Sequence, residues 1–195
     1  MKIHASMLAA NIFDQANWIS KLSSKVDAFH IDIIDPSVAN YVGLDYRIIP
    51  KMHELGYEFY IHYMAKWNDE LIIQMAEQKP AGIFFHQKHI QNRSLFEELK
   101  KSINVGIALE IGDFMEIDVQ QYILMNVQLG YCGQKFDNRN IKLSHQLKAQ
   151  GKTIISDGGI TLDNITELKH FDALVIGNTL NKASVEEINE RLMRK

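Results

Sequence analysis

The sequence predicts a single-domain α/β protein, a (β/α)8 TIM barrel that spans residues 1–195. Short runs rich in β-branched and aromatic residues alternate with stretches in which apolar residues recur every three or four positions. No Pro-, Gly- or Ser-rich linker interrupts this alternation, and 195 residues are enough for one sizeable core but short for two domains. Alternating strands and helices imply a parallel sheet, and eight such units suggest closure into a barrel.

An open, doubly wound sheet is the competing architecture. Nucleotide-binding sheets of that type often carry a GxGxxG motif after the first strand, and this chain has none there. The barrel is therefore the preferred interpretation.

The expected elements follow one another along the chain. Strands are expected over residues 3–8, 28–34, 58–64, 82–86, 105–110, 122–127, 153–156 and 173–176. Helices are expected over stretches such as 16–22, 69–76, 95–101, 141–150, 162–168 and 185–193. Asn138 is a candidate cap for the helix after the sixth strand, and Thr161 or Asp163 for the helix after the seventh.

Composition excludes several classes of partner. The formal net charge is -3 and no basic cluster is present, which argues against nucleic acid and anionic membranes. No segment approaches the roughly 20 apolar residues of a membrane span, and the N-terminus lacks a basic leader with a cleavage site. The single cysteine, Cys132, excludes an internal disulfide and fits a reducing compartment. We expect a cytoplasmic protein.

Four polar side chains interrupt otherwise apolar strands. His30 and Asp32 share one face of the second strand, His62 lies in the third, and Asp157 follows the seventh. Burying such groups is costly unless they are paired or bound to metal. All four fall at or near the carboxyl ends of strands, where the active sites of barrels lie. The set therefore predicts a divalent metal site, which suits zinc best and is compatible with manganese, iron or cobalt.

Glycine-containing turns follow the last two strands, at residues 157–160 and 176–179. Loops in these two positions of a barrel commonly bind phosphate, because glycine lets backbone N–H groups approach an anion and a following helix N-terminus adds a favourable dipole. A phosphorylated substrate is expected.

Seven separated motifs together resemble the ribulose-phosphate 3-epimerase family. They cover almost the whole chain in the family's order: SML at 6–8 with Phe13, HIDIID at 30–35, IHYM at 61–64, MNV at 125–127, GYCGQKF at 130–136, SDGGI at 156–160 and VIGN at 175–178. Any one motif alone would be weak, but their agreement is specific.

The resemblance implies a role for each matching residue. His30, Asp32, His62 and Asp157 would bind one divalent metal ion, and Asp32 and Asp157 would also act as the catalytic acid/base pair. Substrate contacts would come from Ser6, Met64, Met125, Gly130, Gly133, Gly158, Gly159, Gly177 and Asn178. The last four of these would hold the phosphate, and the loop with Gly130 and Gly133 would close over the substrate.

The chain also departs from the family pattern. Ile34 stands where a third methionine is usual, Glu110 replaces an Asn-Pro turn after the fifth strand, and Cys132 replaces a glycine. Residues 36–41 replace a glycine and a longer loop, and Gln128 and Leu129 also differ. These changes lie on the rim expected to meet the sugar and leave the metal set intact. They bear on substrate identity more than on reaction type.

The expected function is metal-dependent epimerisation at C3 of a phosphorylated ketose, with D-ribulose 5-phosphate and D-xylulose 5-phosphate of pentose phosphate metabolism as the default pair. One alternative is a different sugar phosphate, such as a hexulose phosphate or a surface-polysaccharide precursor. Another is a phosphate-binding barrel without catalysis, which the intact Asp32 and Asp157 disfavour. A decarboxylase or aldolase is disfavoured because no lysine stands beside these acids at a strand end. We expect a homo-oligomer. The sequence does not decide whether His86 contacts the substrate or only packs in the core.

Overall fold

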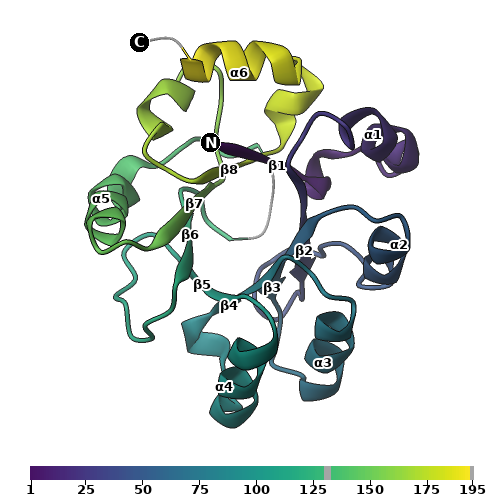
Figure 1. The fold of residues 1–195 in the computed structure, drawn as a ribbon, viewed down its shortest axis with the longest axis vertical. Helices are drawn as coiled ribbons and strands as arrows, with labels where there is room; N and C mark the ends of the chain where they lie inside the picture. Colours follow the sequence, from purple (N-terminus) through teal and green to yellow (C-terminus); the bar gives the residue numbers. More distant parts are fainter. Residues whose placement is uncertain (130–132, 194–195) are drawn as a thin grey trace.

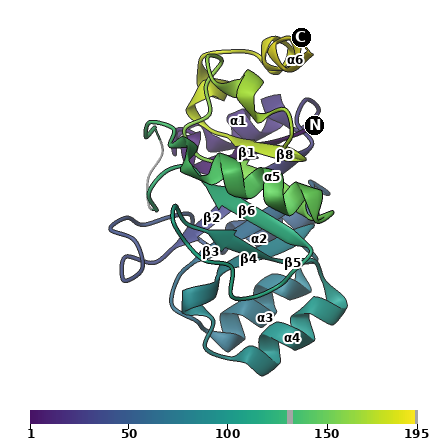
Figure 2. The same cartoon turned by 90° about the vertical axis from the view of Figure 1, so that its left-hand side faces the viewer.

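The computed structural model describes residues 1–129 and 133–193, and over these residues the chain closes into a barrel of eight parallel strands. Figure 1 shows the helices surrounding the strands. In Figure 2 the long loop after the second strand projects to the left, from the end of the barrel where the strands finish. The predicted barrel is confirmed.

The strands pair in sequence order, and β1 pairs with both β2 and β8 to close the barrel. Their bounds are β1 Lys2–Ser6, β2 Ala28–Ile34, β3 Phe59–Met64, β4 Gly82–His86, β5 Val105–Leu109, β6 Gln121–Met125, β7 Thr153–Asp157 and β8 Ala173–Ile176. The register places Asp32 opposite His62 and Met125 opposite Asp157. Polar residues of β2, β3 and β7 therefore reach the same end of the barrel.

Helices cover the outside of the strands. The described residues form α1 Gln15–Leu22, α2 Ile48–Glu54, α3 Asp69–Glu77, α4 Arg93–Ser102, α5 Ile141–Ala149 and α6 Val185–Met193. Short 3-10 helices lie at Met7–Ala9, Gln87–His89, Asn138–Asn140, Ile165–Leu168 and Asn178–Asn181. None of the helices in the described ranges is long and apolar enough to cross a membrane.

Two expected elements differ in type from the structure. The first strand was expected to reach residue 8, but β1 ends at Ser6 because the chain turns into a 3-10 helix, in which Ala10 N–H donates to the Met7 carbonyl at 3.2 Å. The helix expected at 162–168 is reduced to the 3-10 helix Ile165–Leu168. Helix α2 was not singled out from the sequence.

The expected cap at Asn138 is wrong. Asp137 starts the turn instead, since its carboxylate accepts the Arg139 N–H at 3.0 Å. The expected cap at Thr161 or Asp163 is also wrong. Thr161 Oγ1 accepts the Asp163 N–H at 3.3 Å within the turn after β7, but the 3-10 helix begins only at Ile165, and Asn164 precedes it without a side-chain cap hydrogen bond. Side-chain caps on α-helices come from Asn68 at α3 and Asn92 at α4.

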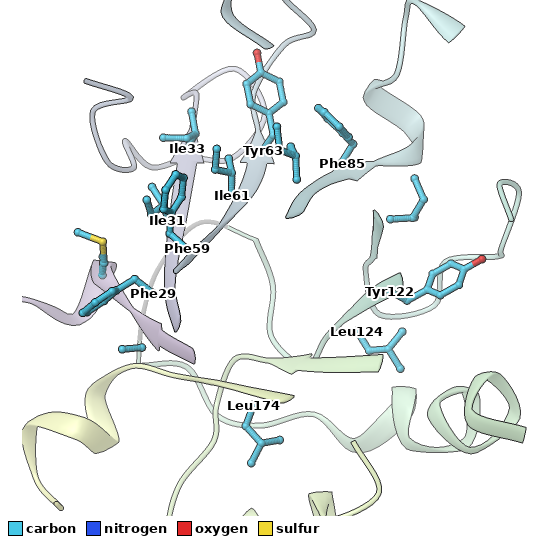
Figure 3. Packing of buried hydrophobic residues seen from close by; sticks show 14 of the residues in the cluster. Phe29, Ile31, Ile33, Phe59, Ile61, Tyr63, Phe85, Tyr122, Leu124 and Leu174 are labelled. Carbon is cyan, nitrogen blue, oxygen red and sulfur yellow. The ribbon is translucent and has the colours of Figure 1, made fainter. Parts of the chain in front are cut away.

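The alternation of side chains along the strands divides the core into two parts. Outward side chains of β2 and β3 pack beneath the helices, as Figure 3 shows for Phe29, Ile31 and Ile33 of β2 and Phe59, Ile61 and Tyr63 of β3. A separate cluster that includes Phe84, Ala108, Ile123, Ile155 and Val175 fills the barrel interior. His30 and Asp32, at the positions between the outward residues of β2, belong to the inward face.

Candidate metal centre and active site

Four side chains meet inside the mouth of the barrel. His30 and Asp32 come from β2, His62 from β3 and Asp157 from β7. One candidate ligand atom from each lies within 4.8 Å of the other three, and all four residues are buried. The structure therefore brings together the set that the sequence singled out.

Nitrogen and oxygen atoms alternate within this cluster. His30 Nε2 lies 3.2 Å from Asp32 Oδ1 and 3.5 Å from Asp157 Oδ2. His62 Nδ1 lies 3.3 Å and 3.5 Å from the same two oxygens. Each carboxylate thus faces both imidazoles.

The donor set fits a divalent cation. Both ring nitrogens of His30 and Nδ1 of His62 are buried without a hydrogen bond of normal geometry to any described residue. Buried polar atoms are ordinarily partnered, so these nitrogens are free to serve as ligands. Two imidazole nitrogens and two carboxylate oxygens form a ligand set suited to zinc and similar ions. The cluster is compatible with a divalent metal ion.

The same contacts shift the acid–base equilibria of the cluster. Burial alone would raise the pKa of Asp32, but the neighbouring His30 and His62 hold it well below its usual range. Burial alone would lower the pKa of His62, but contacts with Asp157 and Asp32 raise it to about 9. The two carboxylates therefore favour the protonated form of the His62 imidazole.

A cavity of about 480 Å³ opens above the cluster, within the usual size of small-molecule sites. Asp32 and Asp157 reach it, whereas His30 and His62 are not among its lining residues. The expected substrate-binding residues in the described part of the chain all line it: Ser6, Met64, Met125, Gly133, Gly158, Gly159, Gly177 and Asn178. Gly130 and Cys132 lie outside the described residues.

Apolar side chains form part of the cavity wall beside the carboxylates. Met64 and Met125 are nearly fully buried, and Ile34 lies directly opposite Met64 in the β2–β3 pairing. On the other side of Asp32, Ser6 Oγ donates to Asp32 Oδ2 at 3.4 Å. The wall therefore places apolar side chains next to Asp32, whose carboxylate is oriented by Ser6.

Glycine is required by local geometry at the turn after β7. Gly158 and Gly159 have φ angles of +96° and +68°. A Cβ atom on Gly158 would lie 2.3 Å from the Val127 side chain, and one on Gly159 would lie 2.6 Å from the Phe136 backbone. Neither position can carry a side chain unless these neighbours shift.

The loop after β2 returns to the strand that it leaves. Gly43 N–H donates to the Ile34 carbonyl at 3.2 Å, and Leu44 N–H donates to the Asp32 carbonyl at 2.9 Å. A Cβ atom on Gly43 would lie 2.5 Å from the Asp32 carbonyl oxygen. The sequence analysis did not single out this glycine, although it noted that the loop at residues 36–41 departs from the family pattern.

A further buried histidine lies next to the cluster. His86, the last residue of β4, is 1% exposed, and its Nε2 lies 2.9 Å from His62 Nε2. It is not among the residues that line the cavity. Burial lowers the pKa of His86 to about 4. The link from His86 to His62 was missed from the sequence, although both residues stand in apolar strands.

Comparison with known proteins places this site in context. The chain matches the ribulose-phosphate 3 epimerase family over residues 2–181. It is 24% identical to the ribulose-phosphate 3-epimerase of Encephalitozoon cuniculi over 91% of this chain and 86% of that protein. It is 28% identical to the ribulose-phosphate 3-epimerase of Methanocaldococcus jannaschii over 84% of this chain and 76% of that protein. Among solved structures, KGPDC from Streptococcus mutans matches with a TM-score of 0.71 and 10% identity, over 98% of this chain and 96% of that one. That structural likeness concerns the fold alone.

Proposed function

Because the chain belongs to the ribulose-phosphate 3-epimerase family and is therefore a carbohydrate isomerase, we propose that it interconverts D-ribulose 5-phosphate and D-xylulose 5-phosphate. The observation that carries this proposal is the pair Asp32 and Asp157, which reach the floor of one cavity from β2 and β7. Epimerisation beside a ketone removes a proton from C3 and returns one to the opposite face. Two carboxylates that approach from different strands suit these two transfers.

The two aspartates share the proton transfers in our proposal. One takes the C3 proton from its face of the substrate, and the other delivers a proton to the opposite face through an ene-diolate intermediate. Reversal exchanges the two roles. General acid–base catalysis of this type contributes typically about 10²–10⁴-fold.

The four-residue cluster that includes these two aspartates would hold the metal ion. His30, Asp32, His62 and Asp157 supply its ligands in our proposal, with zinc the best suited and manganese, iron or cobalt as alternatives. When bound, a divalent ion supplies Lewis-acid stabilisation of negative charge on substrate oxygens, a contribution of several kcal/mol.

The remaining cavity residues would bind and shield the substrate. We assign the phosphate to the backbone at Gly158, Gly159, Gly177 and Asn178, because glycine turns after the last two strands let N–H groups approach an anion. Met64 and Met125 would exclude water from the reacting carbons while adapting to their shape. Gly133 and Ser6 complete the proposed contacts.

A different sugar phosphate is the second candidate substrate. Two features of the rim favour it. Ile34 lines the cavity at a position where the family usually has a third methionine. The loop after β2 also folds back onto its own strand, where Gly43 N–H donates to the Ile34 carbonyl. Hexulose phosphates and surface-polysaccharide precursors belong to this alternative. The reaction type would be unchanged.

Activity on a panel of ketose phosphates in D₂O tests the proposal. We expect deuterium to enter at the carbon beside the carbonyl and the C3 epimer to appear, fastest with D-ribulose 5-phosphate. Preference for a hexulose phosphate would select the second candidate. No exchange with any phosphorylated ketose, by protein loaded with metal, would overturn the proposal.

The roles of the aspartates require separate variants. Asp32→Asn and Asp157→Asn should each abolish epimerisation, while one of them retains exchange of the C3 proton on its surviving face. Metal content must be measured in parallel, because loss of a ligand would produce the same inactivity. Either variant retaining its metal and a near wild-type rate would reject the two-base assignment.

We further propose that the enzyme works in the cytoplasm as a homo-oligomer. The lone cysteine, which fits a reducing compartment, supports the first part. Light scattering coupled to size exclusion tests the second, since a mass of 22.4 kDa would identify a monomer.

A further inference from the structure

Polar side chains continue from the candidate metal cluster to the carboxyl ends of strands β4 and β5. His86 ends β4 and Glu110 directly follows β5. Neither is among the residues that line the cavity, so neither is placed to contact a substrate. The proposed reaction gives them no role.

These side chains form a continuous series of contacts that ends at a proposed metal ligand. His62 Nε2 and His86 Nε2 are 2.9 Å apart, a normal hydrogen-bond distance. The ring centroids are 5.1 Å apart with planes 21° from parallel, so the two rings lie nearly parallel and meet through these nitrogens. On the far side, His86 Nδ1 lies 3.3 Å from Glu110 Oε1, close enough for an ion pair but not aligned as a hydrogen bond in this structure. The same carboxylate pairs with the Lys88 ammonium group.

Only one arrangement of protons satisfies all of these contacts when His62 binds a cation through Nδ1. A ligating nitrogen offers its lone pair, so the single proton of neutral His62 lies on Nε2. His62 then donates to His86 Nε2, which must accept. The proton of His86 is thereby confined to Nδ1, where it faces the Glu110 carboxylate.

The alternative arrangement is unfavourable at both ends. If His86 Nε2 carried the proton, its Nδ1 lone pair would face a carboxylate, and His62 would carry its own proton on Nδ1. That proton would point at Asp32 and Asp157 and block the ligating lone pair. Lys88 keeps Glu110 ionised, since the contacts with His86 and Lys88 lower the Glu110 pKa to about 2 against the effect of burial.

We propose that Glu110 and His86 are positioning residues that hold His62 in the tautomer whose Nδ1 binds the metal ion. The inference rests on the metal site of the proposed function. Partners of this kind, one contact removed from a metal ion, typically change metal affinity by about 10–100-fold when they are lost. His86 and Glu110, which carry this role, belong neither to the proposed metal ligands nor to the proposed substrate contacts.

Tautomers can be read directly by NMR in the zinc-loaded protein with ¹⁵N-labelled histidine. Long-range ¹H–¹⁵N correlations distinguish a protonated ring nitrogen from one with a free or metal-bound lone pair. We expect a proton on Nε2 of His62 and on Nδ1 of His86. A proton on Nε2 of His86 in the zinc-loaded protein would overturn the inference.

Metal affinity provides an independent test that does not depend on catalysis. Metal-free protein is titrated with Zn²⁺ in competition with a chromophoric chelator. We expect Glu110→Gln to weaken binding about tenfold and His86→Leu about 100-fold. His86→Gln should recover part of the loss, because its amide oxygen can still accept the His62 Nε2 proton.

Controls separate positioning from general charge or folding effects. Glu97→Gln on α4 removes one negative charge from a carboxylate paired with Lys100 and should leave zinc affinity unchanged. Urea unfolding of each metal-free variant shows whether the fold is intact. A Glu110→Leu variant, which removes the acceptor altogether, would reject the positioning role if it folded normally and bound zinc as tightly as the wild type. If the wild type itself bound no divalent ion, the proposed metal site would fail instead.

Discussion

At the scale of single residues, the candidate site depends on buried histidines and aspartates that face one another. The sequence pointed to His30, Asp32, His62 and Asp157 because polar residues in apolar strands are costly and therefore informative. Glu110 carried no comparable signal. It directly follows its strand, and its role depends on two contacts across neighbouring strands, with His86 and Lys88, that spacing along the chain does not reveal.

Glu110 should make stability depend on pH in the acid range. Its pKa is lowered from 4.5 to about 2 by His86, against burial, and by Lys88. A depressed pKa in the folded state gives stability that is present above 4.5 and is lost as the pH falls toward 2. Because Glu110 is partly solvated, we expect the advantage of wild type over Glu110→Gln to shrink by only about 1–2 kcal/mol across this range.

Urea unfolding of both proteins at pH 6, 4.5 and 3, with chelator present, measures this difference. Chelation removes any contribution from bound metal. A difference that stays constant with pH would show that the Glu110 carboxylate gains no stability from its neighbours.

At the scale of elements, the turn after β7 shows what local geometry adds to sequence patterns. The paired glycines were expected to form an anion-binding turn, and their positive φ angles explain why glycine is needed. The pattern did not reveal what encloses them, because Val127 and Phe136 come from the segment after β6. The same limit applies to helix ends, where Asp137 rather than Asn138 starts the turn before α5.

Gly159→Ala should damage substrate binding more than folding. The added Cβ would lie 2.6 Å from the Phe136 backbone, so the turn, which lines the cavity, would have to shift. Gly151→Ala is a matched control, since Gly151 has a φ of +74° but nothing within 4 Å of an added Cβ. Both variants should lose about 1 kcal/mol or more of stability from strained backbone.

Steady-state kinetics with a phosphorylated ketose distinguish the two variants. We expect KM to rise at least tenfold in Gly159→Ala and to stay near wild type in Gly151→Ala. Equal KM values in the two variants would remove the turn from the phosphate site. Replacement of Gly177 by a bulky residue should likewise raise KM for the phosphorylated ketose.

Inside the barrel, Gly106 of β5 allows an aromatic ring to fill the core. A Cβ atom at this position would lie 2.3 Å from the Phe84 ring and 2.8 Å from the Gln121 carbonyl oxygen. Gly106→Ala should therefore destabilise the protein by about 1–3 kcal/mol through overpacking.

Thermal unfolding of Gly106→Ala, alone and combined with Phe84→Leu, tests this explanation. The second substitution makes room, so the double variant should lose less stability than the two single losses added together. Simple additivity would place the strain at the Gln121 carbonyl rather than at the Phe84 ring.

At the scale of the whole molecule, strand order is what converts separate motifs into one site. Alternating strands and helices predicted a parallel sheet. The number of units, eight, and the lack of a GxGxxG motif after the first strand then favoured a closed barrel over an open, doubly wound sheet. The crossovers were harder to predict. The segment between β7 and β8 forms only the 3-10 helix Ile165–Leu168 where a longer helix was expected, since amphipathic spacing does not fix how many turns pack against the barrel.

Closure also predicts that metal binding stabilises the entire barrel. The proposed ligands come from β2, β3 and β7, so they converge only when the strands that separate them in the ring are in place. A cation that binds the folded state more tightly than the unfolded chain raises stability by RT ln(1 + [L]/Kd), about 2.7 kcal/mol at a free concentration 100 times Kd. The unfolding temperature of metal-stripped protein should therefore rise with added Zn²⁺ and continue to rise logarithmically beyond saturation.

Variants show whether this rise comes from the cluster. His30→Asn and Asp157→Asn each remove one ligand and should lose most of the increase, while Glu97→Gln on α4 should retain it. Scanning calorimetry over a series of Zn²⁺ concentrations gives the dependence directly. The four proposed ligand atoms lie close together, so removal of the His30 imidazole must weaken zinc binding and reduce the rise in unfolding temperature. An equal rise in His30→Asn and wild type would therefore show that the stabilising ion binds elsewhere.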